Sequence, residues 1–244
     1  MFPQSNILIN LAFCALVKCA IVPGYSNDVP STVINSSISF GDHYAVLNLD
    51  LINALVSTVN ETDVGQQWIN STAIWINTVH QQSPPPLSIY TRIYYTAEMR
   101  PEVSSDTPFL QVISSLGNAT ESDVATQVYP AFTPLEGWDA VLRKSRYYAS
   151  DGNSLEEILR SQHIDTVVMS GIRTSGVILS AALRLFDLNY NVYVISNNTI
   201  EIAPDTPGIN QAILQGILPK LPVNIITIEQ ALDALNRSQS ATYS

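Results

Sequence analysis

Three polar features of the sequence have residue types that could do chemistry together. Asp50 stands inside the apolar stretch "VLNLDLIN", Lys144 ends the stretch "DAVLRK", and the turn "GIRTSGV" begins at Gly171. Burial raises the pKa of a carboxylic acid, and a nearby cation pairs with its ionised form. Free amides at the start of a helix bind anionic oxygens. Together these features indicate acid–base chemistry on a small anionic molecule.

Each feature also has an ordinary structural explanation. Asp50 could cap the turn that follows it, and Lys144 could be a surface side chain whose charge reaches solvent. Thr174 or Ser175 could cap the helix, with Gly176 allowing close packing. The joint placement of the three features favours a site over these separate explanations.

The elements that must position these residues alternate between strands and helices. We expect helices at 66–81, 154–162, 174–189, 209–218 and 229–237, and strands at 44–52, 87–95, 138–144, 165–171, 191–197 and 223–228. Ser154 and Glu157 are expected to form a capping box. The irregular insertion 96–137 is expected to hold a short helix near 107–116 and to shape a site.

Nearly continuous apolar strands separated by helices are typical of a parallel sheet covered on both faces. The sequence therefore predicts an α/β fold, a three-layer α/β/α sandwich around a doubly wound, mainly parallel, Rossmann-like sheet of six strands. Ligands of such folds bind beyond the carboxyl ends of the strands. Because Asp50, Lys144 and the turn all lie at such ends, we expect them to converge.

Residues 1–26 are expected to be a secretory signal peptide. The apolar stretch 7–22 is too short and too broken by Asn10 and Lys18 for a membrane span, and small residues precede a cleavage point after Ser26. A basic n-region is missing, so a disordered or weakly anchored N-terminus is the alternative. The rest of the chain is expected to comprise an N-terminal extension at 27–41, a main domain at 42–237 and a C-terminal tail at 238–244.

Asparagine sequons support secretion. Composition alone predicts about three Asn-x-Ser/Thr matches, and the chain has more. The six glycosylation candidates are Asn35, Asn60, Asn70, Asn118, Asn197 and Asn236. Both cysteines, Cys14 and Cys19, lie in the expected leader, so the mature chain would have no thiol. We therefore expect a secreted, extracellular glycoprotein without a disulfide or a cysteine nucleophile.

The charge balance limits the partners. The chain has 11 Lys and Arg residues against 21 Asp and Glu residues, a formal net charge of −10. Binding to nucleic acid needs basic surface, so no nucleic-acid partner is expected. We therefore expect a small-molecule substrate. No membrane partner is expected once the leader is removed.

From about Asp42 to Leu235 the chain resembles the isochorismatase-like hydrolases, the cysteine hydrolase superfamily that includes nicotinamidases. "AVLNLDLINAL" is similar to the family's "LLVIDMQNDF", and "AVLRKSRYYAS" to "VVxKxRxSAF". "LEEILRSQHIDTVVMSGIRT" is similar to "LxxxLRxxGIDTLVLTGIxT", and "FDLNYNVYVIS" follows the family's exit from the next helix. The matches are in order and correctly spaced over most of the chain.

The resemblance implies roles for single residues. Asp50 and Lys144 match the family's catalytic Asp and Lys. The nucleophilic Cys position falls on Val177, or on Gly176 after a one-residue slip, so the chain resembles a variant without the thiol. Ile52 stands where the family has Gln. The implied substrate or oxyanion contacts are Asn53, Gly171, Arg173, Thr174 and Ser175.

The resemblance has further consequences. No counterpart of the nicotinamidase Asp-x-His site lies near 91–95, so no metal and no cofactor are expected. Similar proteins often form dimers or tetramers, which makes a homo-oligomer an open expectation. A non-proline cis peptide is implied at Ile172–Arg173. Ser175 has no evident general base and is not expected to be a nucleophile.

Two functional hypotheses follow. The first is a secreted hydrolase in which Asp50 and Lys144 act on a small anionic substrate by general acid–base chemistry, without a covalent intermediate. Hydrolysis of an isochorismate-type vinyl ether is such a reaction. The second is a catalytically silent binding or structural protein on the same fold.

Overall fold

A computed structural model describes residues 37–113, 116–202 and 208–238. A parallel sheet of six strands in the order β3-β2-β1-β4-β5-β6 forms its centre. The strands are β1 Tyr44–Leu49, β2 Leu87–Ile93, β3 Ala140–Lys144, β4 Thr166–Ile172, β5 Asn191–Ile200 and β6 Asn224–Ile226. The strand order reverses at β1, as in a doubly wound fold, so the predicted fold class is confirmed.

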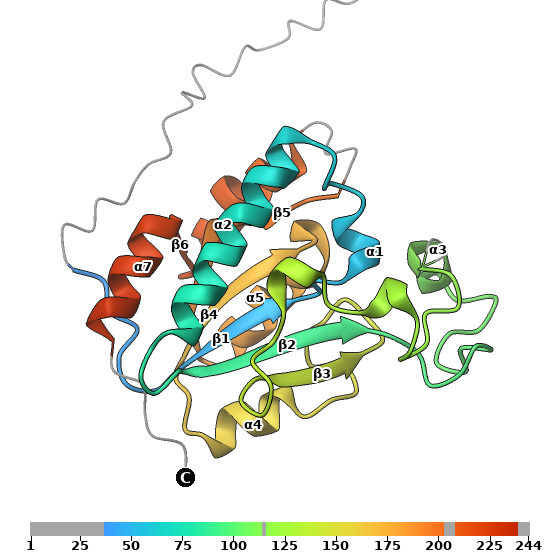
Figure 1. Cartoon of the computed structure of the whole chain (residues 1–244), viewed down its shortest axis with the longest axis horizontal. Coiled ribbons are helices and arrows are strands. Elements are labelled where there is room, and N and C mark those ends of the chain that lie inside the picture. Colours follow the sequence, from blue (N-terminus) through green and yellow to red (C-terminus); the bar gives the residue numbers. More distant parts are fainter. Residues whose placement is uncertain (1–36, 114–115, 203–207, 239–244) are drawn as a thin grey trace, which may run out of the picture. The chain divides into compact units, whose positions relative to one another are not determined.

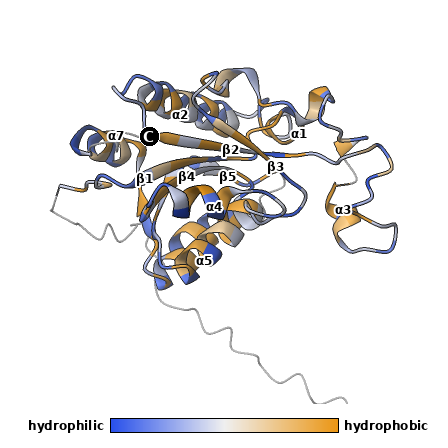
Figure 2. Cartoon of the chain, turned by 90° about the horizontal axis from the view of Figure 1, so that it is seen from below, coloured by the Kyte–Doolittle hydropathy of each residue, from blue (hydrophilic) through white to orange (hydrophobic). Residues whose placement is uncertain are grey.

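Helices cover both faces of the sheet (Figures 1 and 2). One face carries α2 Asp63–His80 and α7 Ile228–Arg237, and the other carries α4 Leu155–Ser161 and α5 Leu179–Asp187. Shorter helical pieces connect them: α1 Asn53–Val56, α3 Phe109–Ile113 and α6 Ile209–Gln211, π-helical turns at Thr174–Ile178 and Ala212–Ile217, and 3-10 turns at Val124–Thr126, Pro130–Phe132 and Leu218–Lys220.

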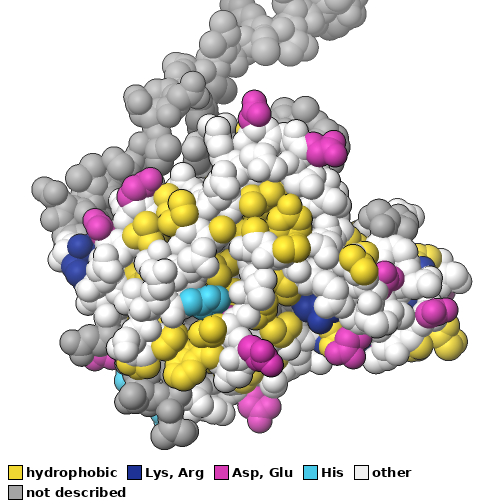
Figure 3. All heavy atoms as spheres, viewed as in Figure 1, with side chains coloured by type: hydrophobic (Ala, Val, Ile, Leu, Met, Phe, Trp, Pro, Cys, Tyr) yellow, Lys and Arg dark blue, Asp and Glu magenta, His cyan; other side chains and the backbone are white. Residues whose placement is uncertain are grey.

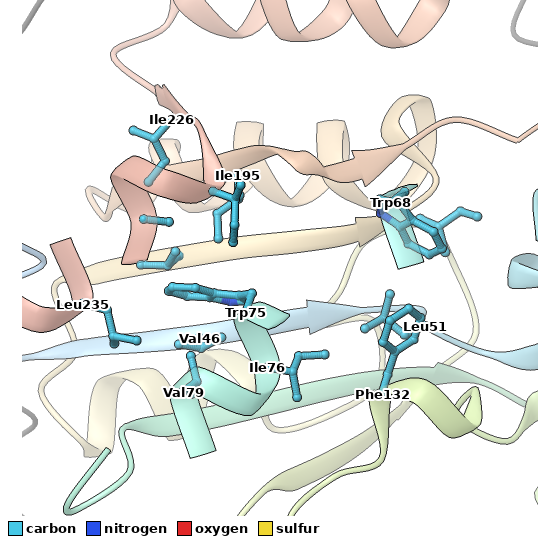
Figure 4. Packing of buried hydrophobic residues seen from close by; sticks show 14 of the residues in the cluster. Val46, Leu51, Trp68, Trp75, Ile76, Val79, Phe132, Ile195, Ile226 and Leu235 are labelled. Atoms are coloured by element: carbon cyan, nitrogen blue, oxygen red, sulfur yellow. The ribbon is translucent and has the colours of Figure 1, made fainter. Parts of the chain in front are cut away.

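The strands are buried because each face of the sheet packs on its own hydrophobic cluster. On the α2 side, Trp75 lies over Val46, and Trp68 meets Phe132 edge-on with ring centroids 5.6 Å apart (Figure 4). Met169 is part of the cluster under α4 and α5. This two-sided burial explains the apolar runs at the centre of the strands.

The insertion between β2 and β3 extends past the carboxyl ends of these strands, where Figure 1 shows α3. The short helix expected near 107–116 is α3. A small cluster of its own, with Tyr95, Val103 and Ile113, holds the insertion. Within the described part of the chain, no helix is long and apolar enough to cross a membrane.

One local prediction is wrong. Ser154 precedes α4, but its side chain makes no capping hydrogen bond. Asn153 accepts instead, from the backbone N–H of Leu155 at 2.9 Å. The only capping box that the described helices show lies at α7, between Thr227 and Gln230. The asparagine side chain one residue earlier accepts from the first amide of α4, whereas the expected capping box would have used the amide of Glu157.

Candidate active site

Asp50 and Lys144 converge at the carboxyl edge of the sheet. Asp50 follows β1 with a φ of 59°, and Lys144 ends β3, two strands away in the sheet. Lys144 Nζ lies 2.6 Å from Asp50 Oδ2, and their side chains are 0% and 2% exposed. Thr91 on β2, the strand between them, donates its hydroxyl to Asp50 Oδ1 at 2.7 Å. The predicted convergence is confirmed, and Thr91 is a further member of the site.

Burial dominates the electrostatics of this pair. Loss of water raises the pKa of Asp50 above its usual range, against the opposing effects of Lys144 and Thr91. Burial likewise lowers the pKa of Lys144, which Asp50 opposes. Lys144 Nζ also donates to the carbonyl oxygen of Tyr147 at 2.9 Å. The pair therefore combines a carboxyl group that holds its proton more tightly with an amine that holds it less tightly.

Gly171 packs strands together. A Cβ at this position would lie 2.1 Å from the carbonyl oxygen of Leu49 on β1, and the φ of Gly171 is 146°. Close approach of β4 to β1 therefore accounts for this glycine, which was expected to contact substrate. The expected cis peptide at Ile172–Arg173 is confirmed.

The turn after β4 is not built as expected. Neither Thr174 nor Ser175 caps the helix: the Thr174 hydroxyl donates to Asn210 Oδ1, and Ser175 Oγ accepts from Arg173 Nε at 2.9 Å. The turn starts with π-helical geometry, which alters the positions that a cap would need. The structural explanation by capping was therefore wrong.

The amides of Ser175 and Gly176 in this turn are not free either. The backbone N–H of Ser175 donates to Glu201 Oε2 at 2.7 Å, and Arg173 Nε lies 2.9 Å from Glu201 Oε1. Gly176 N–H donates to the carbonyl oxygen of Arg173 at 3.1 Å. Glu201 follows β5, so the same rule of strand ends that selected Asp50 could have identified it. The expected empty anion pocket is corrected to one that holds a carboxylate of the chain itself.

The two candidates for the nucleophile position face protein. Val177 is buried in the hydrophobic cluster of the α5 face, together with Leu49 and Met169. A Cβ on Gly176 would lie 2.9 Å from the ring of Tyr147. That ring also meets Phe109 of α3 edge-on, with centroids 5.4 Å apart. Tyr147, which the sequence analysis did not single out, thus covers the turn.

Among the described residues, no hydrogen bond joins Asn53 to Asp50. Its side-chain amide donates to the carbonyl oxygen of Val124 at 2.8 Å, and its backbone N–H donates to Gln127. Asn53 therefore ties α1 to the insertion. Asn53 was expected to contact the substrate, but in the structure it positions the insertion beside the site.

A cavity of about 670 Å³ opens beside the ends of β2 and β3. Hydroxyl groups and charged side chains line it: Tyr94, Tyr95, Thr96, Thr120, Glu121, Ser122 and Arg143. Its size is that of a small-molecule site. Figure 3 shows that acidic side chains outnumber basic ones on the face seen there, and the Arg143 side chain pairs with Glu102. No group of His, Cys, Asp and Glu that could hold a metal occurs among the described residues.

Comparison with known families decides the assignment. Residues 44–211, from β1 to α6, match the model of the Isochorismatase domain. The chain belongs to this family. The Isochorismatase domain thus contains both ion pairs, the turn and the insertion. No curated protein matches the chain.

Solved structures support the same fold. An isochorismatase family protein from Burkholderia thailandensis is 23% identical, with a TM-score of 0.63 over 82% of this chain and 100% of that one. The N-carbamoylsarcosine amidase of Thermoplasma acidophilum is 20% identical, with a TM-score of 0.60 over 77% and 97%. A pyrazinamidase/nicotinamidase from Streptococcus mutans is 17% identical, with a TM-score of 0.56 over 75% and 99%. At these identities the likeness concerns the Isochorismatase domain fold.

Proposed function

We propose that this protein is a secreted hydrolase of a small anionic substrate, in which Asp50 is the general acid. The observation that carries the proposal is the buried contact of 2.6 Å between Asp50 and Lys144. Burial raises the pKa of Asp50, which favours the protonated form that a general acid needs. Lys144 orients the carboxyl group or meets a substrate carboxylate.

The proposed reaction is the hydrolysis of a vinyl ether. Asp50 gives its proton to the terminal vinyl carbon, and the ether oxygen stabilises the resulting cation. Water adds to the cationic carbon and loses a proton to Asp50. The hemiketal hydroxyl then gives up its proton to the ether oxygen as the bond between that oxygen and the carbon breaks, so that an alcohol leaves and a ketone remains. Atoms balance with one water, and no bond to the protein forms.

The absence of a covalent intermediate follows from the residues at the turn. Both cysteines of the chain, Cys14 and Cys19, precede the Isochorismatase domain. Val177 offers no nucleophilic atom, and the Ser175 hydroxyl accepts from Arg173. An amidase-type thiol step therefore has no candidate in the domain.

A catalytically silent binding protein is the second candidate. It is favoured by the carboxylate of Glu201 at the Ser175 amide and by the complete burial of Lys144. In that case the Asp50–Lys144 pair would serve only the structure. A panel of vinyl-ether and amide substrates separates the two candidates.

Turnover of a vinyl ether by the purified protein is expected to be abolished in Asp50→Asn, because the amide has no acidic proton to give. Circular dichroism should show the variant folded. Asp187→Asn, an exposed carboxylate at the end of α5, is the matched control and should keep full activity. No turnover by the wild type would favour the silent protein. Turnover of amides with a trapped acyl-enzyme would contradict the proposed mechanism.

Secretion and glycosylation are also proposed. Asn70, Asn118, Asn197 and Asn236 are exposed and Asn60 is partly buried, whereas Asn35 and the leader lie outside the described residues. We expect a mature chain that begins near residue 27 and carries glycans on several of these sites. N-terminal sequencing and a mobility shift after glycosidase treatment test this, and an intact Met1 without a shift contradicts it.

A further inference from the structure

The charged side chains around the turn form two closed ion pairs. Asp50 pairs with Lys144, and Glu201 pairs with Arg173. Tyr147 joins them, because its carbonyl oxygen accepts from Lys144 and its hydroxyl accepts from Arg173 at 3.2 Å. An anionic ligand that approaches either of these two cations therefore meets one that already has a carboxylate partner. It must displace one of the two carboxylates.

Glu201 is the carboxylate that can be displaced. Lys144 is 0% exposed, whereas the side chain of Arg173 is 33% exposed, so Arg173 is the cation that a ligand meets first. Arg173 Nε and the backbone N–H of Ser175 hold the two oxygens of Glu201 at 2.9 and 2.7 Å. A guanidinium group that pairs with one oxygen and an amide that donates to the other together form a receptor for a carboxylate.

We propose that Glu201 is an internal occupant of a carboxylate-binding site formed by Arg173 and Ser175, and that it determines which ligands the turn accepts. The inference rests on the proposed function in taking the turn as the place where the substrate anion binds. A carboxylate tethered to the same chain has a high effective concentration, so it outcompetes simple free carboxylates. Only a ligand with additional contacts would replace it.

Removal of the Glu201 carboxylate is expected to create a vacant site for small carboxylates. In the full mature protein at pH 7, Glu201→Ala should lower the midpoint of thermal unfolding by about 5–10 °C, because the ion pair with Arg173 and the hydrogen bonds from the amides of Ser175 and Ile202 are lost. Acetate or formate, but not chloride at equal ionic strength, should then restore the midpoint in a saturable way. The wild type should not respond.

Three further variants define the result. Glu201→Gln fills the space and should be less stable than the wild type, without a response to acetate. The double variant Glu201→Ala/Arg173→Met should lose the acetate response, and Glu136→Ala, at an exposed position, should behave as the wild type.

A Glu201→Ala protein that acetate does not stabilise would overturn the inference, as would an equal acetate response in the wild type. If Glu201→Ala does not fold, Glu201→Gln decides: stability equal to the wild type overturns the inference. These outcomes are independent of turnover. Acetate binding without hydrolysis rejects the proposed function alone, and hydrolysis without acetate binding rejects this inference alone.

Discussion

Replacement of Lys144 by methionine should destabilise the protein by about 3–5 kcal/mol at neutral pH, because it leaves the buried carboxylate of Asp50 without its cation. Lys144 Nζ is 2.6 Å from Asp50, and both side chains lie almost entirely out of water. Thr91 would remain as the one side-chain donor to Asp50 among the described residues. Urea unfolding of the two proteins measures the difference.

The loss of stability in Lys144→Met should depend on pH in a defined direction. Burial raises the pKa of Asp50, and removal of Lys144 takes away the largest effect that opposes burial. The folded Lys144→Met variant therefore binds the Asp50 proton more tightly than the unfolded chain does. Its stability relative to the wild type should be best at low pH and should fall as the pH rises through the folded pKa of Asp50.

Two variants provide the controls. Asp50→Asn/Lys144→Met removes both charges and should recover much of the lost stability, since no unpaired charge stays buried. Arg160→Met removes an exposed cation that faces Glu156 at 3.5 Å and should change stability by less than about 1 kcal/mol. Equal losses of unfolding free energy in Lys144→Met and Arg160→Met would contradict the buried ion pair between Asp50 and Lys144.

Replacement of Gly171 by alanine should be at least as damaging, with a loss of about 4 kcal/mol or more. A Cβ at Gly171 would lie 2.1 Å from the carbonyl oxygen of Leu49, and this oxygen belongs to a central strand that cannot move aside. The φ of 146° adds backbone strain for any residue with a side chain. The soluble yield and the midpoint of thermal unfolding report the effect.

Gly216 is the matched control for this substitution. It lies in a helical turn, no heavy atom within 4 Å would meet its Cβ, and its φ is not in the left-handed region. Gly216→Ala should be neutral or slightly stabilising. A stable Gly171→Ala protein would show that β1 and β4 can separate, and it would contradict the packing role assigned to this glycine.

Much of the fold follows from local sequence patterns. Apolar runs separated by helical periodicity predicted six strands and the parallel sheet, because a strand buried on both faces needs apolar side chains at consecutive positions. The boundaries differ by a few residues: the first strand was expected to reach residue 52, and it ends at Leu49. The hydrogen bonds that end a strand come from neighbouring elements, so a local pattern does not contain them.

The meeting of Asp50 and Lys144 also follows from the sequence. Both residues end strands, and the carboxyl ends of parallel strands share one edge of the sheet, whatever the distance along the chain. The family motifs around them led to the same pair of residues. This part of the site depends on strand direction alone, which the apolar pattern and the short connections determine.

Only the tertiary structure decided what the turn after β4 contains. Glu201 comes 26 residues after Ser175, and Tyr147 comes 26 residues before Arg173, so neither contact lies within a local pattern. The sequence also could not tell whether the side chain of Val177 enters the site or the core. Its direction follows from how the π-helical turn packs against the sheet. Side-chain partners depend on three-dimensional packing, whereas the sequence determined the strands, their order along the chain and the edge where they end.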